Sequence, residues 1–311
     1  MRIFFYKILK FSFIFFVYFY FFALSIENKI ILKINNQIIT KLDIYQEANY
    51  LKALNPNINN LEEIKILEIA QSSLVREKIK EIELLKYNKN KINKEYLQEI
   101  LQSIYTKIGL RNMNEFKQYI GTFGISIQII EKKLKTEAHW NQLIYNKFYS
   151  KLKIDKKMIR ENMKTTKRDT STLYHLYEIL FNLENDINSE DLFKNIEKSI
   201  HENGFENAAS IYSISETSRT GGNLGWVNEN NINDKISKKI NNLKIGEHTE
   251  PILLPGGFLI LKLKDKKSIK KKIDLEKEIN LKIRSLQNQQ LNQYSNIYFK
   301  KIKKNILINE K

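Results

Sequence analysis

The stretch from 266 to about 304 predicts one long amphipathic helix, and this helix constrains the fold more than any other feature of the chain. Its apolar side chains recur at helical spacing and would form one stripe: Leu275, Ile279, Ile283, Leu286, Leu291, Tyr294 and Tyr298. An isolated helix of this length cannot bury such a stripe. We therefore expect it to pack on helices from the start of the chain, so that both ends form one domain.

The segment before residue 153 predicts a small hairpin followed by helices. Two β-branched runs, 30–34 and 37–39, flank Asn35-Asn36, a dipeptide suited to a tight turn. Thr40 and Asp43 form the pattern of a capping box, so a helix should cover about 42–54. Apolar spacing predicts further helices over about 61–87, 94–108, 114–122 and 126–152, with Trp140 in the core.

Composition changes after Lys153, and the polar, basic stretch 164–168 is interpreted as a linker. The segment 171–264 holds most of the glycines and predicts strand 174–181, helix 189–203, a loop, a short helix 237–241 and a closing strand 257–264. The stretch 305–308 is β-prone. The expected fold class is therefore α+β: a helical domain from both chain ends, with a small N-terminal β-hairpin, and an inserted α/β domain. The expected boundaries are 26–168, 169–265 and 266–311.

Residues 1–25 are interpreted as a signal peptide. Arg2, Lys7 and Lys10 precede an apolar run of 14 residues, 11–24, which is shorter than the ~20 residues that cross a bilayer. Small side chains at Ala23 and Ser25 place cleavage after Ser25. The alternative is an uncleaved anchor in the inner membrane, and either interpretation exports the rest of the chain.

Composition excludes several kinds of chemistry. Without cysteine, the chain has no disulfide scaffold, thiolate metal site or cysteine nucleophile, and its four scattered histidines do not suggest a metal site. We expect no metal and no cofactor. The net charge of +17 reflects either an electrostatic function or the Ile, Lys and Asn bias of an AT-rich genome. Export and the spread of lysines along helices argue against nucleic acid as a partner.

Glycine motifs in the inserted segment carry a resemblance to a known family. The entry strand ends in Glu178-Ile179-Leu180-Phe181, Tyr212-Ser213 is followed by the loop 221–226 with the sequence GGNLGW, and the segment closes with GE at 246–247, EPI at 250–252 and GGFLILK at 256–262. In combination these features resemble the parvulin family of peptidyl-prolyl isomerases. With the leader, the helical flanks and the returning helix, the exported chain resembles the SurA family of periplasmic chaperones.

The resemblance implies a set of site residues. Glu178, Ser215 and Leu259 stand where parvulins usually have a histidine, a cysteine or aspartate, and a second histidine. His175 lies three residues before Glu178 and should face the other side of the strand. The apolar proline pocket corresponds to Leu224, Ile232, Ile236 and Phe258, although Ile232 and Ile236 could equally be ordinary core. Because all three polar positions are substituted, we expect weak or absent isomerase activity.

The resemblance also implies a function and partners. The leading hypothesis is a periplasmic chaperone that holds outer-membrane protein precursors, binds segments rich in aromatic residues or proline, and transiently contacts the outer-membrane assembly machinery. Aromatic side chains of the helical part would contact such clients: Tyr45, Tyr50, Tyr87, Phe116, Tyr119 and Tyr294. The alternative is an active secreted prolyl isomerase.

Overall fold

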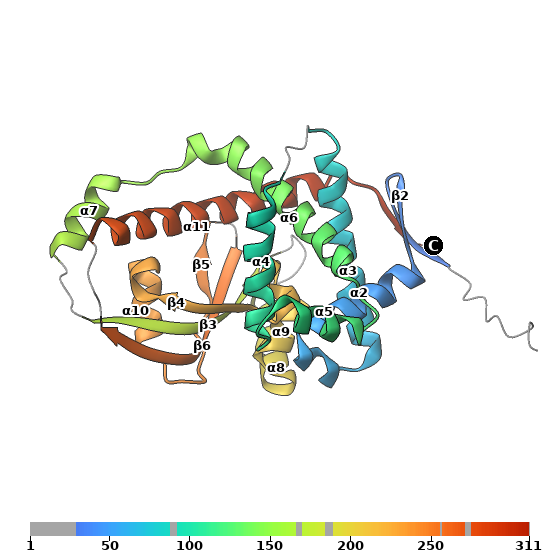
Figure 1. The fold of residues 1–311 in the computed structure, drawn as a ribbon, viewed down its shortest axis with the longest axis horizontal. Helices are drawn as coiled ribbons and strands as arrows, with labels where there is room; N and C mark the ends of the chain where they lie inside the picture. Colours follow the sequence, from blue (N-terminus) through green and yellow to red (C-terminus); the bar gives the residue numbers. More distant parts are fainter. Residues whose placement is uncertain are drawn as a thin grey trace, which may run out of the picture.

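A computed structural model describes residues 29–87, 92–165, 170–183, 189–255, 257–270 and 275–310 (Figure 1). The predicted signal peptide and residues 166–168 of the predicted linker lie outside these ranges. Within them, no helix combines the length and apolar character needed to cross a bilayer.

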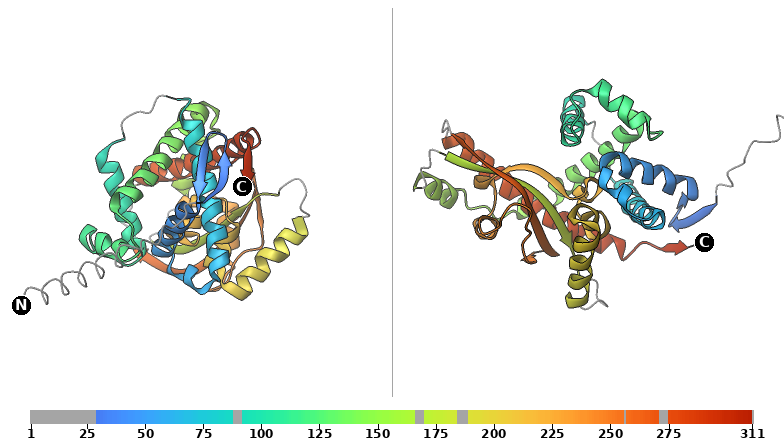
Figure 2. Two further views of the ribbon diagram at one scale, coloured as in Figure 1. Left: turned by 90° about the vertical axis from the view of Figure 1, so that its right-hand side faces the viewer. Right: turned by 90° about the horizontal axis from the view of Figure 1, so that it is seen from below.

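The two ends of the described chain meet in one small sheet. Strands β1 (Ile30–Ile34) and β2 (Gln37–Thr40) form the predicted hairpin, and Asn35 in its turn has a φ of 49°. The last strand, β7 (Ile308–Glu310), pairs antiparallel with β1, which gives the order β2-β1-β7. The hairpin and the C-terminal strand lie side by side in both views of Figure 2.

Helices build the rest of what we call the helical body. The first begins at the predicted capping box, where the backbone N–H of Asp43 donates to Thr40 Oγ1 and Thr40 N–H donates to the Asp43 carboxylate. The body comprises α2 (Lys41–Leu54), η2 (Pro56–Asn60), α3 (Glu63–Leu84), α4 (Lys94–Lys107), α5 (Met113–Gly121), α6 (Ile127–Phe148), η3 (Tyr149–Lys151), α7 (Lys156–Thr165) and α11 (Leu275–Lys303).

The long C-terminal helix α11 packs on the N-terminal helices, as its apolar stripe predicted. Trp140 of α6 is fully buried, and its indole N–H donates to Ser295 Oγ of α11 at 2.8 Å. Tyr298 of α11 donates to Glu83 of α3, and Ile302 joins the core of the N-terminal helices. Both ends of the chain therefore share one hydrophobic core.

The inserted domain is a four-stranded antiparallel sheet in the order β4-β3-β6-β5. Its strands are β3 (Thr170–Phe181), β4 (Asn223–Asn228), β5 (Ile252–Leu254) and β6 (Gly257–Lys270). Helices α8 (Ser189–Asn203) and α9 (Phe205–Tyr212) cover one face through a core that includes Ile179, Phe205 and Ile260. Helix α10 (Asp234–Asn241) covers the other face with Ile236 and Ile240. The 3-10 turns η4 (Glu216–Thr220) and η5 (Glu229–Asn231) complete the domain.

Several elements differ from the sequence-based expectation. Helix α9 and strand β4 occupy the stretch that we expected to be a loop, and the last two residues of α7, 164–165, fall in the stretch that we expected to be a linker. Strand β6 continues to Lys270 because β3 begins at Thr170 and pairs with it along its whole length. The C-terminal helix consequently begins at Leu275, not at Lys266.

Candidate functional site

A carboxylate and two hydroxyls form the polar centre of the inserted domain. Glu178 Oε1 on β3 accepts hydrogen bonds from Ser215 Oγ at 2.6 Å and Thr217 Oγ1 at 2.8 Å. The backbone supports this arrangement, because Glu178 N–H donates to the Gly222 carbonyl at 2.8 Å. Gly222 has a φ of +79°, and a Cβ there would collide with the Glu178 carbonyl oxygen. This position of the GGNLGW loop therefore requires glycine.

The helical body supplies a cation to this centre. Lys107, at the end of α4, donates from Nζ to the Asn223 carbonyl at 3.1 Å and lies against Gly225. Burial raises the pKa of Glu178, and the hydrogen bonds from Ser215 and Thr217 and the charge of Lys107 offset this only in part. Burial also lowers the pKa of Lys107. Because Glu178 and Lys107 carry opposite charges, each favours the charged form of the other against the effect of burial.

Four of the predicted site residues share a face of the sheet with Glu178. Leu259 pairs with Leu180, two residues along β3 from Glu178, and packs in one cluster with Ile232, Ile236 and the partly buried Leu224. Ile232 and Ile236 are only 8% and 6% exposed. Their side chains are thus part of the domain core.

The remaining predicted pocket residue, Phe258, lies on the opposite face of the sheet. It stacks on Phe181 with ring centroids 5.6 Å apart and packs with the cluster under α8 and α9. His175 also lies on that face, where its ring contacts those of Tyr177 and Trp226. The structure thus brings Phe258 together with neither Glu178 nor Ser215.

The loop that carries Ser215 and Thr217 is anchored in the helical body. Arg76 of α3 donates to the Ile214 carbonyl at 2.6 Å, and Lys80 of α3 forms an ion pair with Glu216. Arg219 bonds to Glu137 of α6 at 3.3 Å. Ser215 and Thr217 thus contact Glu178. The charged residues Glu216 and Arg219 hold the same loop to α3 and α6.

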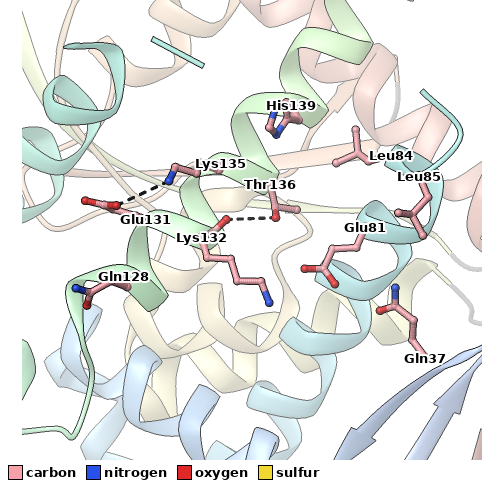
Figure 3. Close-up of a pocket in the computed structure, with 10 residues that line it drawn as sticks. All are labelled: Gln37, Glu81, Leu84, Leu85, Gln128, Glu131, Lys132, Lys135, Thr136 and His139. Carbon is pink, nitrogen blue, oxygen red and sulfur yellow. Dashed lines mark hydrogen bonds and ion pairs between the residues drawn. The ribbon is translucent and has the colours of Figure 1, made fainter. Parts of the chain in front are cut away.

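The helical body has a cavity of about 440 Å³ between β2, α3 and α6 (Figure 3). Leu84 at the end of α3 and Leu85, the residue that follows the helix, form an apolar side of it, and polar residues of α6 form another. Leu84 is buried in the core, whereas Leu85 is 69% exposed. The lining residues are Gln37, Glu81, Leu84, Leu85, Gln128, Glu131, Lys132, Lys135, Thr136 and His139.

The aromatic residues expected to contact clients fall into two groups. Tyr50 and Phe116 are buried in the core of the helical body, and Tyr119 and Tyr294 pack against it. Tyr45 and Tyr87 are 41% and 38% exposed and are therefore accessible from solvent.

Sequence reasoning missed two residues of the polar centre. Thr217 could have been found, because it follows Ser215 by two residues and its hydroxyl has the same chemistry. Lys107 gave no such signal, since it lies 71 residues before Glu178 in the sequence and reaches the site only through the packing of α4.

Residues 179–265 match a family model described as Rotamase, the PPIC-type PPIASE domain. The inserted segment therefore contains a domain of the parvulin type, as the glycine motifs predicted.

The similarity to curated proteins extends beyond that domain. The chain is 24% identical over 186 residues to Chaperone SurA of Pseudomonas putida, covering 57% of this chain and 43% of the relative. It is 22% identical over 195 residues to Chaperone SurA of Pseudomonas syringae pv. tomato, covering 59% and 46%. The chain is thus SurA-like, and it spans less than half the length of these relatives.

Solved structures with similarity include a SurA-like chaperone from Campylobacter jejuni, at 17% identity over 91% of this chain and 99% of the other, with a TM-score of 0.34. PrsA from Bacillus subtilis is 21% identical over 89% of this chain and 92% of its own, with a TM-score of 0.27.

Proposed function

We propose that this protein is a periplasmic chaperone that holds unfolded precursors of outer-membrane proteins, and that its PPIC-type domain isomerises prolyl bonds weakly or not at all. Similarity to Chaperone SurA supports the chaperone assignment. The hydrogen bonds that Glu178 accepts from Ser215 and Thr217 are the observation that supports weak or absent isomerase activity.

Prolyl isomerisation requires rotation over a barrier of ~18–20 kcal/mol. A site lowers this barrier by desolvating the amide and by aiming hydrogen-bond donors at its twisted form. Here the hydroxyl protons of Ser215 and Thr217 are both directed at Glu178, and Lys107 donates to a backbone carbonyl. Leu259 offers no donor, and it is 7% exposed. The polar groups of the centre thus satisfy one another, which leaves little for a substrate.

Turnover of a proline-containing tetrapeptide tests this part of the proposal. We expect a rate close to that of the uncatalysed reaction, with no further loss in Ser215→Ala. A rate near that of an active parvulin, abolished by Ser215→Ala, would instead favour the alternative function of a secreted prolyl isomerase.

We further propose that the cavity between β2, α3 and α6 binds apolar side chains of the client. Its apolar side ends in the exposed Leu85, and Ile38 of the adjoining strand β2 is 47% exposed. An unfolded β-barrel precursor exposes alternating apolar residues, and burial of each large one is worth about 1.5–3 kcal/mol. The holding function then needs no energy source.

Two matched leucine variants test the cavity. Leu85 and Leu253 are 69% and 73% exposed, and Leu253 lies on β5 of the inserted domain. We expect Leu85→Glu to weaken suppression of light scattering by a diluted outer-membrane protein precursor several-fold, and Leu253→Glu to leave it unchanged. Equal effects of both variants would exclude the cavity as the client site.

A further inference from the structure

One end of the PPIC-type sheet carries an exposed tryptophan among lysines. Trp226 of β4 is 41% exposed, and its ring stacks on His175 with centroids 5.2 Å apart. Lys267 of β6 places its Nζ 4.1 Å from the centre of the Trp226 ring. Lys264 and Lys266, on the same stretch of β6, are exposed as well. Lys266 is adjacent to Lys267 and therefore faces the opposite side of the sheet, so the positive charge lies on both faces of this end. We call Trp226, Lys264, Lys266 and Lys267 the sheet tip.

The sheet tip has an excess of positive charge. Among the residues that the structure describes, no ion pair joins any of its three lysines to a carboxylate, and the one acidic residue between them is Asp265. The tip also lies far from the client cavity. The end of β6 that leads to α11 lies at the left of Figure 1, whereas β2 and α3, which line the cavity, lie to the right.

This combination matches the chemistry of an anionic phospholipid surface. Lysine side chains extend their ammonium groups toward lipid phosphates while their methylenes cover apolar surface. An indole ring prefers the boundary between headgroups and acyl chains. A bound peptide would instead need pockets for its side chains. We propose that the sheet tip binds an anionic phospholipid bilayer, which would direct the client cavity away from the membrane.

The lysines have a simpler interpretation that must be tested at the same time. Strand β5 pairs with β6 only from Gly257 to Leu259, so Lys264 to Lys267 occupy a stretch of β6 that β5 does not cover. Lysines on an open edge commonly prevent pairing with another chain. If that is their only role, their removal causes aggregation but leaves lipid binding unchanged.

Co-sedimentation with vesicles separates these possibilities. The whole protein is mixed with vesicles of phosphatidylcholine alone or of phosphatidylcholine with phosphatidylglycerol. Each lysine near an anionic surface contributes a factor of about 5 to binding. The variant K264Q/K266Q/K267Q should therefore bind the mixed vesicles about 100-fold more weakly. The control K94Q/K117Q/K301Q removes the same charge from exposed positions on α4, α5 and α11 and should bind like the wild type.

Tryptophan fluorescence gives a second readout. The chain has two tryptophans, and Trp140 is fully buried, so a blue shift on adding mixed vesicles reports on Trp226. The expected result is a shift that rising salt reverses and that the tip variant lacks. Equal losses in the two triple variants, or no binding to mixed vesicles, would overturn the proposal. An acidic unfolded peptide that shifts the emission when vesicles do not would make the tip a peptide surface and would likewise overturn it.

Discussion

The indole of Trp140 joins the N-terminal helices to α11, and its replacement tests whether the two ends of the chain form one folding unit. The ring is fully buried between Tyr298 and Phe299 of α11, with centroid distances of 5.8 and 6.2 Å. Its N–H donates to Ser295 Oγ at 2.8 Å. All three contacts cross from α6 to α11.

The expected magnitudes differ with the part of the side chain that is removed. Trp140→Ala leaves a large cavity and should lower the free energy of unfolding by about 3–5 kcal/mol. Ser295→Ala leaves the buried indole N–H without its acceptor, at a cost of about 1–3 kcal/mol. Trp140→Phe removes the donor and retains an aromatic ring. In the double variant Trp140→Phe/Ser295→Ala, the coupling energy should be about 1 kcal/mol.

Urea unfolding followed by far-ultraviolet circular dichroism measures these changes without relying on tryptophan fluorescence. Thr136→Ala in the same helix is a control, because that side chain hydrogen-bonds only locally, to the Lys132 carbonyl at 3.3 Å. If Ser295→Ala and Trp140→Ala change the unfolding free energy no more than Thr136→Ala, α11 does not stabilise the N-terminal helices and the shared core is wrong.

Two further predictions concern the ion pairs of Glu137 and the glycine at position 222. Burial alone raises the pKa of Glu137, but the charge of Lys80, a hydrogen bond with Glu216 and the charge of Arg219 outweigh it and hold the pKa below its usual range. The stabilisation is therefore complete above the unfolded-chain pKa of about 4.3 and is lost as the pH falls below it, so Glu137→Gln should flatten the acid dependence of the urea midpoint. An unchanged acid limb would contradict this. Gly222→Ala should destabilise by more than about 1 kcal/mol, because its Cβ would collide with the Glu178 carbonyl, and a wild-type midpoint would refute that geometry.

Much of the helical body could be predicted from the sequence because its signals are local. The hairpin turn at Asn35 and the capping box at Thr40 each depend on residues a few positions apart. The stripe on α11 also predicted the return of the chain, since an apolar face of that length needs a partner. The start of α11 could not be predicted in this way. Residues 266–270 have no strong strand pattern, and they extend β6 because β3 from Thr170 pairs with them.

The candidate site was likewise predictable from local sequence motifs only in part. The glycine motifs identified the PPIC-type domain and led to Glu178 and Ser215, which the structure brings within hydrogen-bonding distance. The sheet alternation that separates Phe258 from Leu259 was available in the sequence, since adjacent strand residues face opposite sides. The anchoring by Lys107 and Arg76 was not, because both come from helices that are distant in sequence.

The central claim is that this chain holds clients without using its isomerase-type site. The most direct measurement is the aggregation of an unfolded outer-membrane protein precursor, followed by light scattering in the presence of equimolar wild-type protein or Ser215→Ala. The account predicts that both suppress aggregation equally, and that neither accelerates isomerisation of a proline tetrapeptide. Loss of suppression in Ser215→Ala, in parallel with loss of tetrapeptide turnover, would contradict it.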